Sequence, residues 1–504
     1  MKYLKRLLSL FLAFILVIFL FSGCEESECT SHKDDDDNGL CDSCEASLIV
    51  TVDFYAINDL HGKFRDTSSN EGVDELTTYL KNTALTDDNT VLLSSGDMWQ
   101  GSSESNLTNG LIVTDWMNEL DFVSMTLGNH EYDWGEEMIE ENEKLADFPF
   151  LAINIYDRET NVLVDYCEPS VMIERDGIQI GIIGAMGDCY SSISADKSGD
   201  VYFKVGRELT ALVKAESERL RFLGADYIVY SIHDGYGQSR NTTMHVNGSK
   251  LYSYYDTTLS DGYVDLVFEA HTHQRYVLID EYGVYHLQNG GENKGISHVE
   301  ININSVTNSS SVSEAEFVES SEYEALEGDS LRDELVEKYS DMIAKGDEVV
   351  GHVRTYKYSD AIKNKVAELY YQKGVQVWGD EYNIVLGGGF ISTRSPYNLS
   401  SGEIRYSQLQ SILPFDNQLV LCSVKGEDLL RKFFESNNDN YYIYFEEYGK
   451  NVWENIDPAE TYYIIVDSFT STYRYNNLTE IERYDDGIYA RDLLAEFIKA
   501  GGWE

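Results

Sequence analysis

Basic residues are scarce in this 504-residue chain. It has 38 lysines and arginines against 88 aspartates and glutamates, which gives a formal net charge of −50 at pH 7. A surface of this sign repels DNA, RNA and anionic lipid, so we expect no nucleic-acid polymer among its partners. A small phosphorylated substrate can still bind where metal cations supply local positive charge.

Long apolar runs are absent after the N-terminus. At the N-terminus itself, basic residues precede an apolar run over residues 7–21, and Ser22, Gly23 and Cys24 follow. This order is typical of a signal peptide, here over residues 1–23. Residues 21–24 are also similar to a bacterial lipobox, so we expect an exported lipoprotein held at the cell membrane by lipid on Cys24. A signal anchor is the alternative, but the run is shorter than the ~20 residues of a span.

Cysteine is also scarce, with seven in the chain. Four of them crowd the N-terminus, at positions 24, 29, 41 and 44. If Cys24 carries lipid, six remain, and export permits disulfides among them. The spacing does not specify their pairing.

Residues 24–47 are acidic and poor in apolar side chains, which predicts a tether. Within them, the calcium-loop pattern D-x-[DN]-x-[DN]-G-x5-E is matched by Asp34, Asp36, Asn38, Gly39 and Glu45. Oxygen ligands at alternate positions suit a hard cation such as calcium. The flanks lack the two helical patterns of an EF-hand, so a chance match in an acidic linker is the alternative.

From residue 48, short apolar runs alternate with polar, helical stretches. The runs have strand length and are rich in Val, Ile and Phe; they lie at 48–57, 90–93, 122–126, 150–153, 178–183, 227–232 and 264–268. The alternation predicts an α/β protein with a layered sheet up to about residue 318. We expect a connecting helix over 319–348 and a second domain over 349–504, and two domains also fit the chain length.

Residues that can bind metals follow five of these predicted strands. They are Asp59 and His61, Asp97, Asn129 with His130, His233, and His271 with His273. Open α/β sheets place ligands outside the carboxyl ends of their strands, so these residues are expected to meet at one site. The other histidines, at 32, 245, 286, 298 and 352, lack this context and are expected to be structural or solvated.

Imidazole with carboxylate oxygen suits zinc, manganese and similar transition-metal ions. Two such ions ~3.5–4 Å apart can clamp the attacking and leaving oxygens of a phosphoryl displacement, with one carboxylate between them. The residues therefore predict a phosphate-ester hydrolase with two divalent transition-metal ions.

Five ordered motifs carry a resemblance to a known family. They are Asn-Asp-x-His-Gly at 58–62, Gly-Asp-x-x-x-Gly-Ser at 96–102, Leu-Gly-Asn-His-Glu-Tyr-Asp-x-Gly at 127–135, Ile-His-Asp-Gly at 232–235 and His-Thr-His at 271–273. The set resembles the calcineurin-like metallophosphoesterases, and more closely their 5′-nucleotidase branch, which includes UDP-sugar hydrolases and cyclic phosphodiesterases. The resemblance implies a four-layer αββα sandwich over residues 48–318 and a separate C-terminal α/β domain that binds nucleotide.

The resemblance also implies a role for each site residue. Asp59, His61 and His273 would hold one metal, Asn129, His233 and His271 the other, and Asp97 would bridge them. His130 would donate to the transferring phosphoryl group, oriented by Asp133.

The second domain departs from the family at its substrate contacts. The family pattern Asn-Gly-Gly-Gly-Ile-Arg reads Leu-Gly-Gly-Gly-Phe-Ile at 386–391, so its asparagine and arginine are both missing. Arg394 is the candidate replacement, because a guanidinium matches phosphate, and a surface arginine is the alternative. By resemblance, Phe415 and Phe469 are candidates for stacking on the base, and core packing is the alternative for both.

Hydrolysis of nucleoside 5′-monophosphates to nucleoside and phosphate is the predicted activity. A UDP-sugar hydrolase or a 2′,3′-cyclic nucleotide phosphodiesterase on the same metal centre is one alternative. A surface binding protein without turnover is another, which seven metal-ligand candidates together with His130 disfavour. The sequence does not specify the native metal or the oligomeric state.

Overall fold

The computed structural model describes residues 32–64, 72–194, 197–236, 242–246, 249–253, 255–394, 396–431, 441–445, 456–474, 477–484 and 487–503. The chain divides into two compact units, residues 1–49 with 304–309, and residues 50–303 with 310–504. Cys24 and the predicted signal peptide lie outside the described residues. Within the described part, no helix combines the length and apolar character that crossing a bilayer requires.

The smaller unit is a loop closed by side-chain hydrogen bonds. The Asp34 carboxylate accepts from the backbone N–H of Asn38 (2.9 Å) and Gly39 (2.8 Å), and Asn304 donates to the same group. Asp36 accepts from the Asn38 amide at 3.0 Å. Residues 32–48 contain turns and an isolated bridge but no helix. The calcium site at Asp34, Asp36, Asn38 and Glu45 therefore stays a prediction, with two of its carboxylates bonded to their own loop.

The larger unit begins with two six-stranded sheets. The first has the order β16-β15-β1-β2-β3-β4, with β1 Ile49–Ile57, β2 Thr90–Ser94, β3 Ser124–Thr126, β4 Phe150–Leu151, β15 Gly295–Asn304 and β16 Ser310–Glu319. The second has the order β13-β14-β12-β9-β7-β6, with β6 Ser170–Arg175, β7 Ile178–Met186, β9 Tyr227–His233, β12 Leu266–Glu269, β13 Arg275–Ile279 and β14 Tyr285–Asn289. Strands β1 to β4 are parallel, as are β7, β9, β12 and β14.

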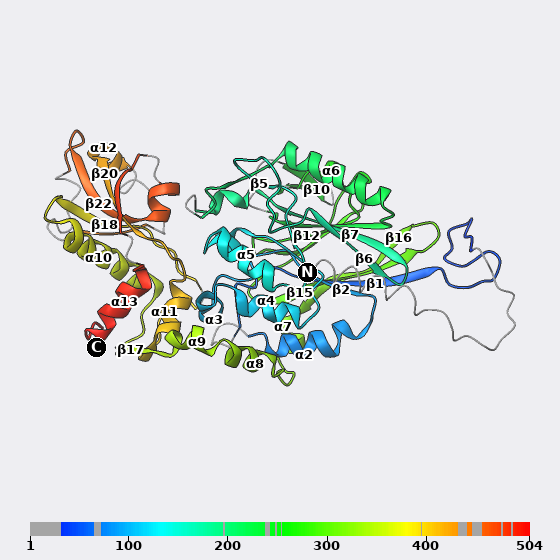
Figure 1. Ribbon diagram of the computed structural model, residues 1–504, viewed down its shortest axis with the longest axis horizontal. Coiled ribbons are helices and arrows are strands. Elements are labelled where there is room, and N and C mark those ends of the chain that lie inside the picture. The colour runs from blue at the N-terminus through cyan, green and yellow to red at the C-terminus, as the bar shows by residue number, and fades with distance from the viewer. Residues whose placement is uncertain are drawn as a thin grey trace. The chain divides into compact units, whose positions relative to one another are not determined.

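Alternation along β1 shows why both faces of the first sheet are covered. Phe54 packs in the core between the two sheets, whereas Tyr55 packs in the core beneath the helices on the outer face. Those helices include α2 (Asp74–Asn82), α4 (Leu111–Asn118) and α5 (Glu136–Leu145). Helix α6 (Arg207–Phe222) covers the outer face of the second sheet (Figure 1). The four-layer αββα sandwich expected from the resemblance is confirmed.

The segment predicted as one connecting helix forms four short helical pieces instead. They are α7 Ser320–Tyr323, α8 Leu331–Lys338, α9 Ser340–Ile343 and the 3-10 turn Ala344–Asp347. In the turn before α8, the Asp329 carboxylate accepts from the Leu331 N–H at 2.8 Å. A high content of charged residues predicted helix here but did not reveal its breaks.

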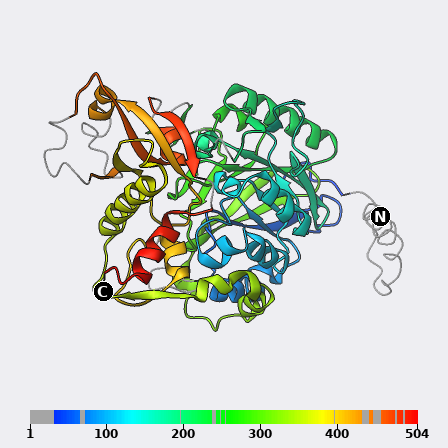
Figure 2. The ribbon, with the colours of Figure 1, turned by 60° about the vertical axis from the view of Figure 1, so that its left-hand side comes forward.

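The C-terminal part is a second α/β domain, as expected. Its sheet has the order β21-β18-β22-β20-β23, with β18 Ile384–Phe390, β20 Leu419–Lys425, β21 Tyr441–Tyr444, β22 Thr461–Asp467 and β23 Thr479–Tyr484. Helices α10 (Ser359–Trp378) and α13 (Ala490–Lys499) pack in its main core (Figure 2). Gly387 allows β18 to approach α10, because a Cβ there would lie 2.3 Å from the backbone nitrogen of Tyr371.

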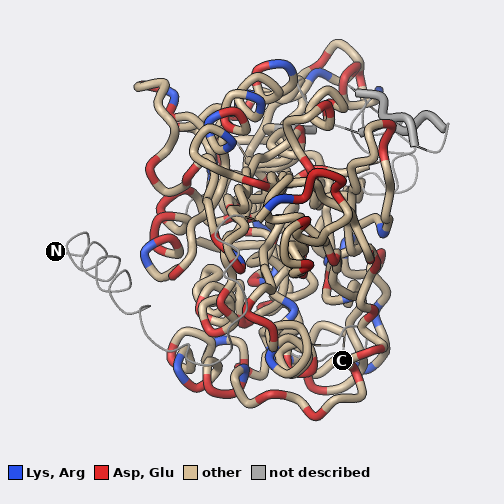
Figure 3. The backbone as a smooth tube through the Cα atoms, turned by 90° about the vertical axis from the view of Figure 1, so that its right-hand side faces the viewer, with Lys and Arg blue, Asp and Glu red and all other residues tan. Residues whose placement is uncertain are grey.

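The remaining elements connect these layers. They are α3 Ser103–Leu107, α11 Tyr406–Ile412, α12 Gly426–Leu429, and the strand pairs β5 Ile155–Asp157 with β8 Val201–Phe203, β10 Thr242–Val246 with β11 Ser249–Ser253, and β17 Val349–Val353 with β19 Gly402–Arg405. Acidic residues are distributed along the chain rather than gathered in one segment (Figure 3). Any basic side chain near the functional site is therefore a local exception to the overall negative charge of the chain.

Candidate metal centre

The first predicted ligand group assembles where β1 and β12 end. Ligand atoms of Asp59, His61 and His273 all lie within 4.8 Å of one another. The Nε2 atoms of His61 and His273 are 3.1 Å apart, and Asp59 Oδ1 is 3.3 Å from His273 Nε2. Such convergence of imidazole nitrogens and a carboxylate is suited to one transition-metal ion.

Asp97 connects this group to the second one. Its Oδ2 atom lies 3.2 Å from Nε2 of His233 and 3.9 Å from Nε2 of His61, so one carboxylate oxygen faces a ligand of each group. The rings of His233 and His271 are in edge contact, with centroids 5.5 Å apart. This is the placement that a bridging carboxylate requires.

Two buried atoms test whether metal ions fit these residues. Asn129 Oδ1 is buried without a hydrogen-bond partner, and the buried His233 Nε2 has only its ion-pair contact with Asp97. The opposite nitrogens of His61 and His233 are engaged, since each Nδ1 lies 2.7–2.8 Å from a backbone carbonyl, of Gln100 and Ser95 respectively. A carbonyl on Nδ1 fixes the tautomer that leaves Nε2 able to bind a metal. The donor set therefore fits divalent ions.

The backbone at the site is held in an uncommon conformation. Five of the seven predicted ligands have positive φ, between 50° and 66°: Asp59, His61, Asp97, His271 and His273. Non-glycine residues adopt this region rarely and chiefly where surrounding structure enforces it, often at functional sites. Gly128 is required nearby, because a Cβ at that position would lie 2.3 Å from Asp97 Oδ1.

Burial and neighbouring charges set the protonation of the ligands. Burial lowers the pKa of His61 well below its usual range and that of His271 to about 4, which keeps both rings in the neutral form that binds metals. At Asp97, burial opposes ionisation, but the adjacent His233 and His130 hold the pKa well below its ordinary value. At His233, burial lowers the pKa, but nearby carboxylates, Asp97 first among them, raise it on balance to about 10. Metal binding there must therefore release a proton.

His130 is held in a different way from the ligands. Its Nδ1 lies 2.9 Å from Asp133 Oδ2, and its Nε2 lies 2.7 Å from an Nη of Arg394. A guanidinium can only donate, so Nε2 accepts in this arrangement and Nδ1 donates to Asp133. The structure thus places His130 and Asp133 together, as predicted.

Glu131 is a site residue to which the sequence analysis gave no role. Its fully buried carboxylate accepts from the backbone N–H groups of Asp97 (2.9 Å), Met98 (2.8 Å) and Gly128 (2.7 Å). It thereby joins the loop after β2 to the loop after β3. Burial, with Asp97 nearby, raises the pKa of Glu131 to about 7. Its place in the motif beside His130 was the available signal.

Cys189 is a second residue without a predicted role. Its thiol is 2.9 Å from the backbone carbonyl of His233, and its sulfur groups with ligand atoms of His233 and His271. It follows β7 in the sequence Gly187-Asp188-Cys189, and the sequence analysis assigned no ligand to this strand end.

A cleft lies against the metal-ligand residues. It is lined by Asn129, His130 and His271 and, from the C-terminal domain, by Phe390, Arg394, Phe415 and Phe469 among others. The three predicted substrate-binding residues, Arg394, Phe415 and Phe469, therefore share one cleft. Phe390 was missed, and it pairs with Phe469 at a centroid distance of 5.8 Å. Its position directly after the glycine run was the only signal.

The cleft holds a positive group and an aromatic ring near His130. Arg394 is half-buried, and its Nε is buried without a hydrogen-bond partner. The guanidinium carbon lies 5.6 Å from the centroid of the Phe415 ring, and that ring lies 6.1 Å from the His130 ring. This is a position from which Arg394 can meet a phosphate, rather than that of a solvated surface arginine.

Comparison with known proteins agrees with this geometry. Residues 52–275 match the family described as calcineurin-like phosphoesterase. The chain is 24% identical over 412 residues to protein UshA of Yersinia enterocolitica, which covers 73% of this chain and 72% of that protein. It is 28% identical over 185 residues to a 5′-nucleotidase of Vibrio cholerae, covering 36% of this chain and only 32% of that protein.

A solved structure shows the same fold over most of the chain. The 5′-nucleotidase precursor of Thermus thermophilus superposes with a TM-score of 0.67 at 19% identity, over 90% of this chain and 96% of the other. The likeness includes both the sandwich and the C-terminal domain.

Proposed function

The chain belongs to the calcineurin-like metallophosphoesterases, in the 5′-nucleotidase/UshA family, and from this premise we propose that it hydrolyses nucleoside 5′-monophosphates to nucleoside and phosphate. The observation that carries the proposal is the cleft itself. Metal-ligand residues line one side, and aromatic rings of the C-terminal domain line the other. The centroids of the Phe415 and His130 rings lie 6.1 Å apart, and this separation suits a substrate whose phosphate and base are separated by a sugar.

The residues that would hold two divalent ions are those described above. Asp59, His61 and His273 form one group, Asn129, His233 and His271 the other, and Asp97 faces both. Two bound ions supply a nucleophile at neutral pH and positive charge for the phosphoryl oxygens.

His130 and Arg394 act on the phosphoryl group from the cleft side. Burial lowers the pKa of His130, but the carboxylates of Asp133 and Asp97 raise it on balance, which favours an imidazolium. Such a ring donates from Nδ1 to Asp133 and can donate from Nε2 to a phosphoryl oxygen, whereas the neutral ring accepts from Arg394 at Nε2, so Arg394 must leave Nε2 when the imidazolium meets substrate. Arg394 reaches the same point, since it contacts Nε2 directly, and its guanidinium fork suits a phosphate.

A substrate panel tests this proposal against hydrolysis of nucleotide sugars and cyclic nucleotides. We expect kcat/KM to be highest for AMP when AMP, UDP-glucose and 2′,3′-cyclic AMP are compared with the same added metal. A tenfold or greater preference for either of the other two substrates would replace the proposal with that activity.

Phe415 is expected to decide affinity for the base. Stacking on an aromatic ring contributes ~1–3 kcal/mol per base, so Phe415→Ala should raise KM for AMP by roughly tenfold or more. Hydrolysis of glycerol phosphate, which has no ring to stack, should change little. Steady-state kinetics on both substrates measure the difference.

The matched control is Phe222→Ala on α6, because that side chain is 89% exposed and does not line the cleft. It should leave both substrates unaffected. Equal losses on AMP and glycerol phosphate in Phe415→Ala would mean that this phenylalanine supports the domain rather than the base.

We also propose that the chain is exported and anchored through lipid on Cys24. The order of basic, apolar and small residues before Cys24 supports this. A diacylglycerol provides the two chains that stable anchoring takes, so Cys24→Ala should leave uncleaved precursor or release the protein into the aqueous phase. Cys422→Ser, at a buried position in the C-terminal domain, is the control. An unmodified residue 24 in mass spectra of the mature protein would refute the anchor.

A further inference from the structure

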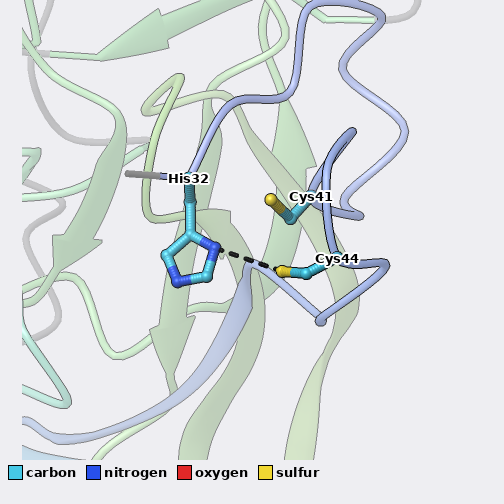
Figure 4. A group of neighbouring side chains, drawn as sticks. All are labelled: His32, Cys41 and Cys44. Atoms are coloured by element: carbon cyan, nitrogen blue, oxygen red, sulfur yellow. Dashed lines mark hydrogen bonds between the residues drawn. The ribbon is translucent and has the colours of Figure 1, made fainter. Parts of the chain in front are cut away.

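Three metal-binding side chains lie together in the smaller unit. Donor atoms of His32, Cys41 and Cys44 are all within 4.8 Å of one another, and His32 Nδ1 is 3.7 Å from Cys44 Sγ. Figure 4 shows the two sulfur atoms and the ring nitrogen turned toward a common space. None of these residues belongs to the catalytic group, and the sequence analysis expected His32 to be structural or solvated.

The backbone presents both sulfurs from one tight turn. The Cys41 carbonyl accepts from the N–H groups of Cys44 (3.3 Å) and Glu45 (2.8 Å), and the Cys41 N–H donates to Ala46 at 2.9 Å. Glu45, directly after the second cysteine, has φ of 60°, which turns the chain back. Two cysteines separated by two residues on such a turn have the spacing of structural zinc sites.

We propose that His32, Cys41 and Cys44 bind a zinc ion that closes the N-terminal segment into a folded unit. Thiolate and imidazole ligands favour zinc over the hard, oxygen-seeking calcium ion. These three residues supply thiolate and imidazole ligands, the kinds of ligand that structural zinc sites use.

The Cys41 side chain is 1% exposed, whereas His32 and Cys44 are exposed, so the cluster lies at the surface of the smaller unit, where an ion can reach it.

Hydrogen bonds extend the unit beyond the zinc ligands. Between His32 and Cys41, the Asp34 carboxylate holds the turn at Asn38 and Gly39 and accepts from Asn304. Thr307 and Ser309 both donate to Asp37. A metal ion that fixes the two ends of this loop would therefore order a stretch predicted to be a plain tether.

A disulfide between Cys41 and Cys44 is the competing state, because export permits it. None of the five cysteines among the described residues is disulfide-bonded. A disulfide would also give no reason for the imidazole of His32 to lie against the pair.

Cobalt substitution in the full-length protein tests the site, because thiolate-bound cobalt has a charge-transfer absorption that nitrogen and oxygen ligands do not produce. We expect this band in the wild-type protein, its loss in Cys41→Ser/Cys44→Ser, and its retention in Cys189→Ser, whose sulfur lies near the catalytic histidines. Zinc X-ray absorption should show sulfur at ~2.3 Å in the wild type only. The double variant should bind one metal equivalent fewer and keep its phosphatase activity.

Two further measurements complete the test. His32→Ala should weaken zinc binding, and an unchanged zinc affinity in this variant would overturn the assignment of His32 as a ligand. A band that is absent from reduced wild-type protein, or that persists in the double variant, would overturn the zinc site. A Cys41–Cys44 disulfide, found by mass spectrometry in protein purified from its native cellular compartment, would also overturn the zinc site.

Discussion

Replacing Asp97 by asparagine is expected to lower kcat/KM for AMP by about 10³-fold or more, because metal ions contribute several kcal/mol of transition-state stabilisation and ~4 kcal/mol corresponds to three powers of ten. The reason is geometric. One Asp97 oxygen faces both His61 and His233, so loss of its charge weakens both metal groups together. We expect the variant to contain less metal after dialysis, measured by mass spectrometry of the elements.

Asparagine is the informative substitution, because it preserves shape and one oxygen. Asp97 Oδ1 accepts from the His130 N–H at 2.8 Å, and an amide oxygen can keep that bond. Asp88→Asn, at an exposed position, is the matched control for the charge change and should behave as the wild type. An Asp97→Asn protein with full metal content and near-normal turnover would show that this carboxylate does not bridge the ions.

His130→Ala is expected to retain its metal and lose about 10²- to 10³-fold in kcat, the range for removing one donor to a developing charge. The His130 side chain is hydrogen-bonded to Asp133 and Arg394, and alanine keeps the backbone N–H that donates to Asp97, so the substitution should leave the ions in place. Since its proposed donation is to the phosphoryl group, AMP and an aryl phosphate should lose rate by similar factors.

The comparison of leaving groups makes this prediction specific. A residue that protonates the leaving oxygen would matter for AMP but little for an aryl phosphate, whose leaving group needs no proton. A loss confined to AMP would therefore reassign His130 to the leaving group. Loss of metal would reassign it to the ligands. Asp133→Asn, which removes the charge beside Nδ1 but can keep an acceptor oxygen, should show a smaller defect of the same kind.

The metal centre was predictable because its residues obey a rule that is visible along the chain. Ligands such as Asp59, His233 and His271 directly follow apolar runs, and parallel strands bring their carboxyl ends to one edge. The strand runs themselves were predictable for the same reason, since buried strands read as continuous apolar stretches.

Other features depend on tertiary contacts that leave no periodic signal. Glu131 acts through backbone N–H groups from two loops, and its place in the motif beside His130 did not reveal these partners. Phe390 lines the cleft only because Phe469, far along the chain, packs beside it. His32 lies beside Cys44 because hydrogen bonds to Asp34 hold the turn between them. The sequence pattern suggested Asp34 as a calcium ligand instead.

Counting metal ions against phosphate release tests the central claim most directly. The Cys41→Ser/Cys44→Ser protein, stripped of metal and titrated with manganese or zinc, isolates the catalytic centre from the proposed N-terminal site. We predict no release of phosphate from AMP without metal, and full activity when two ions are bound per chain. Activity that is independent of metal, or that is complete with a single ion, would contradict a dinuclear nucleotidase.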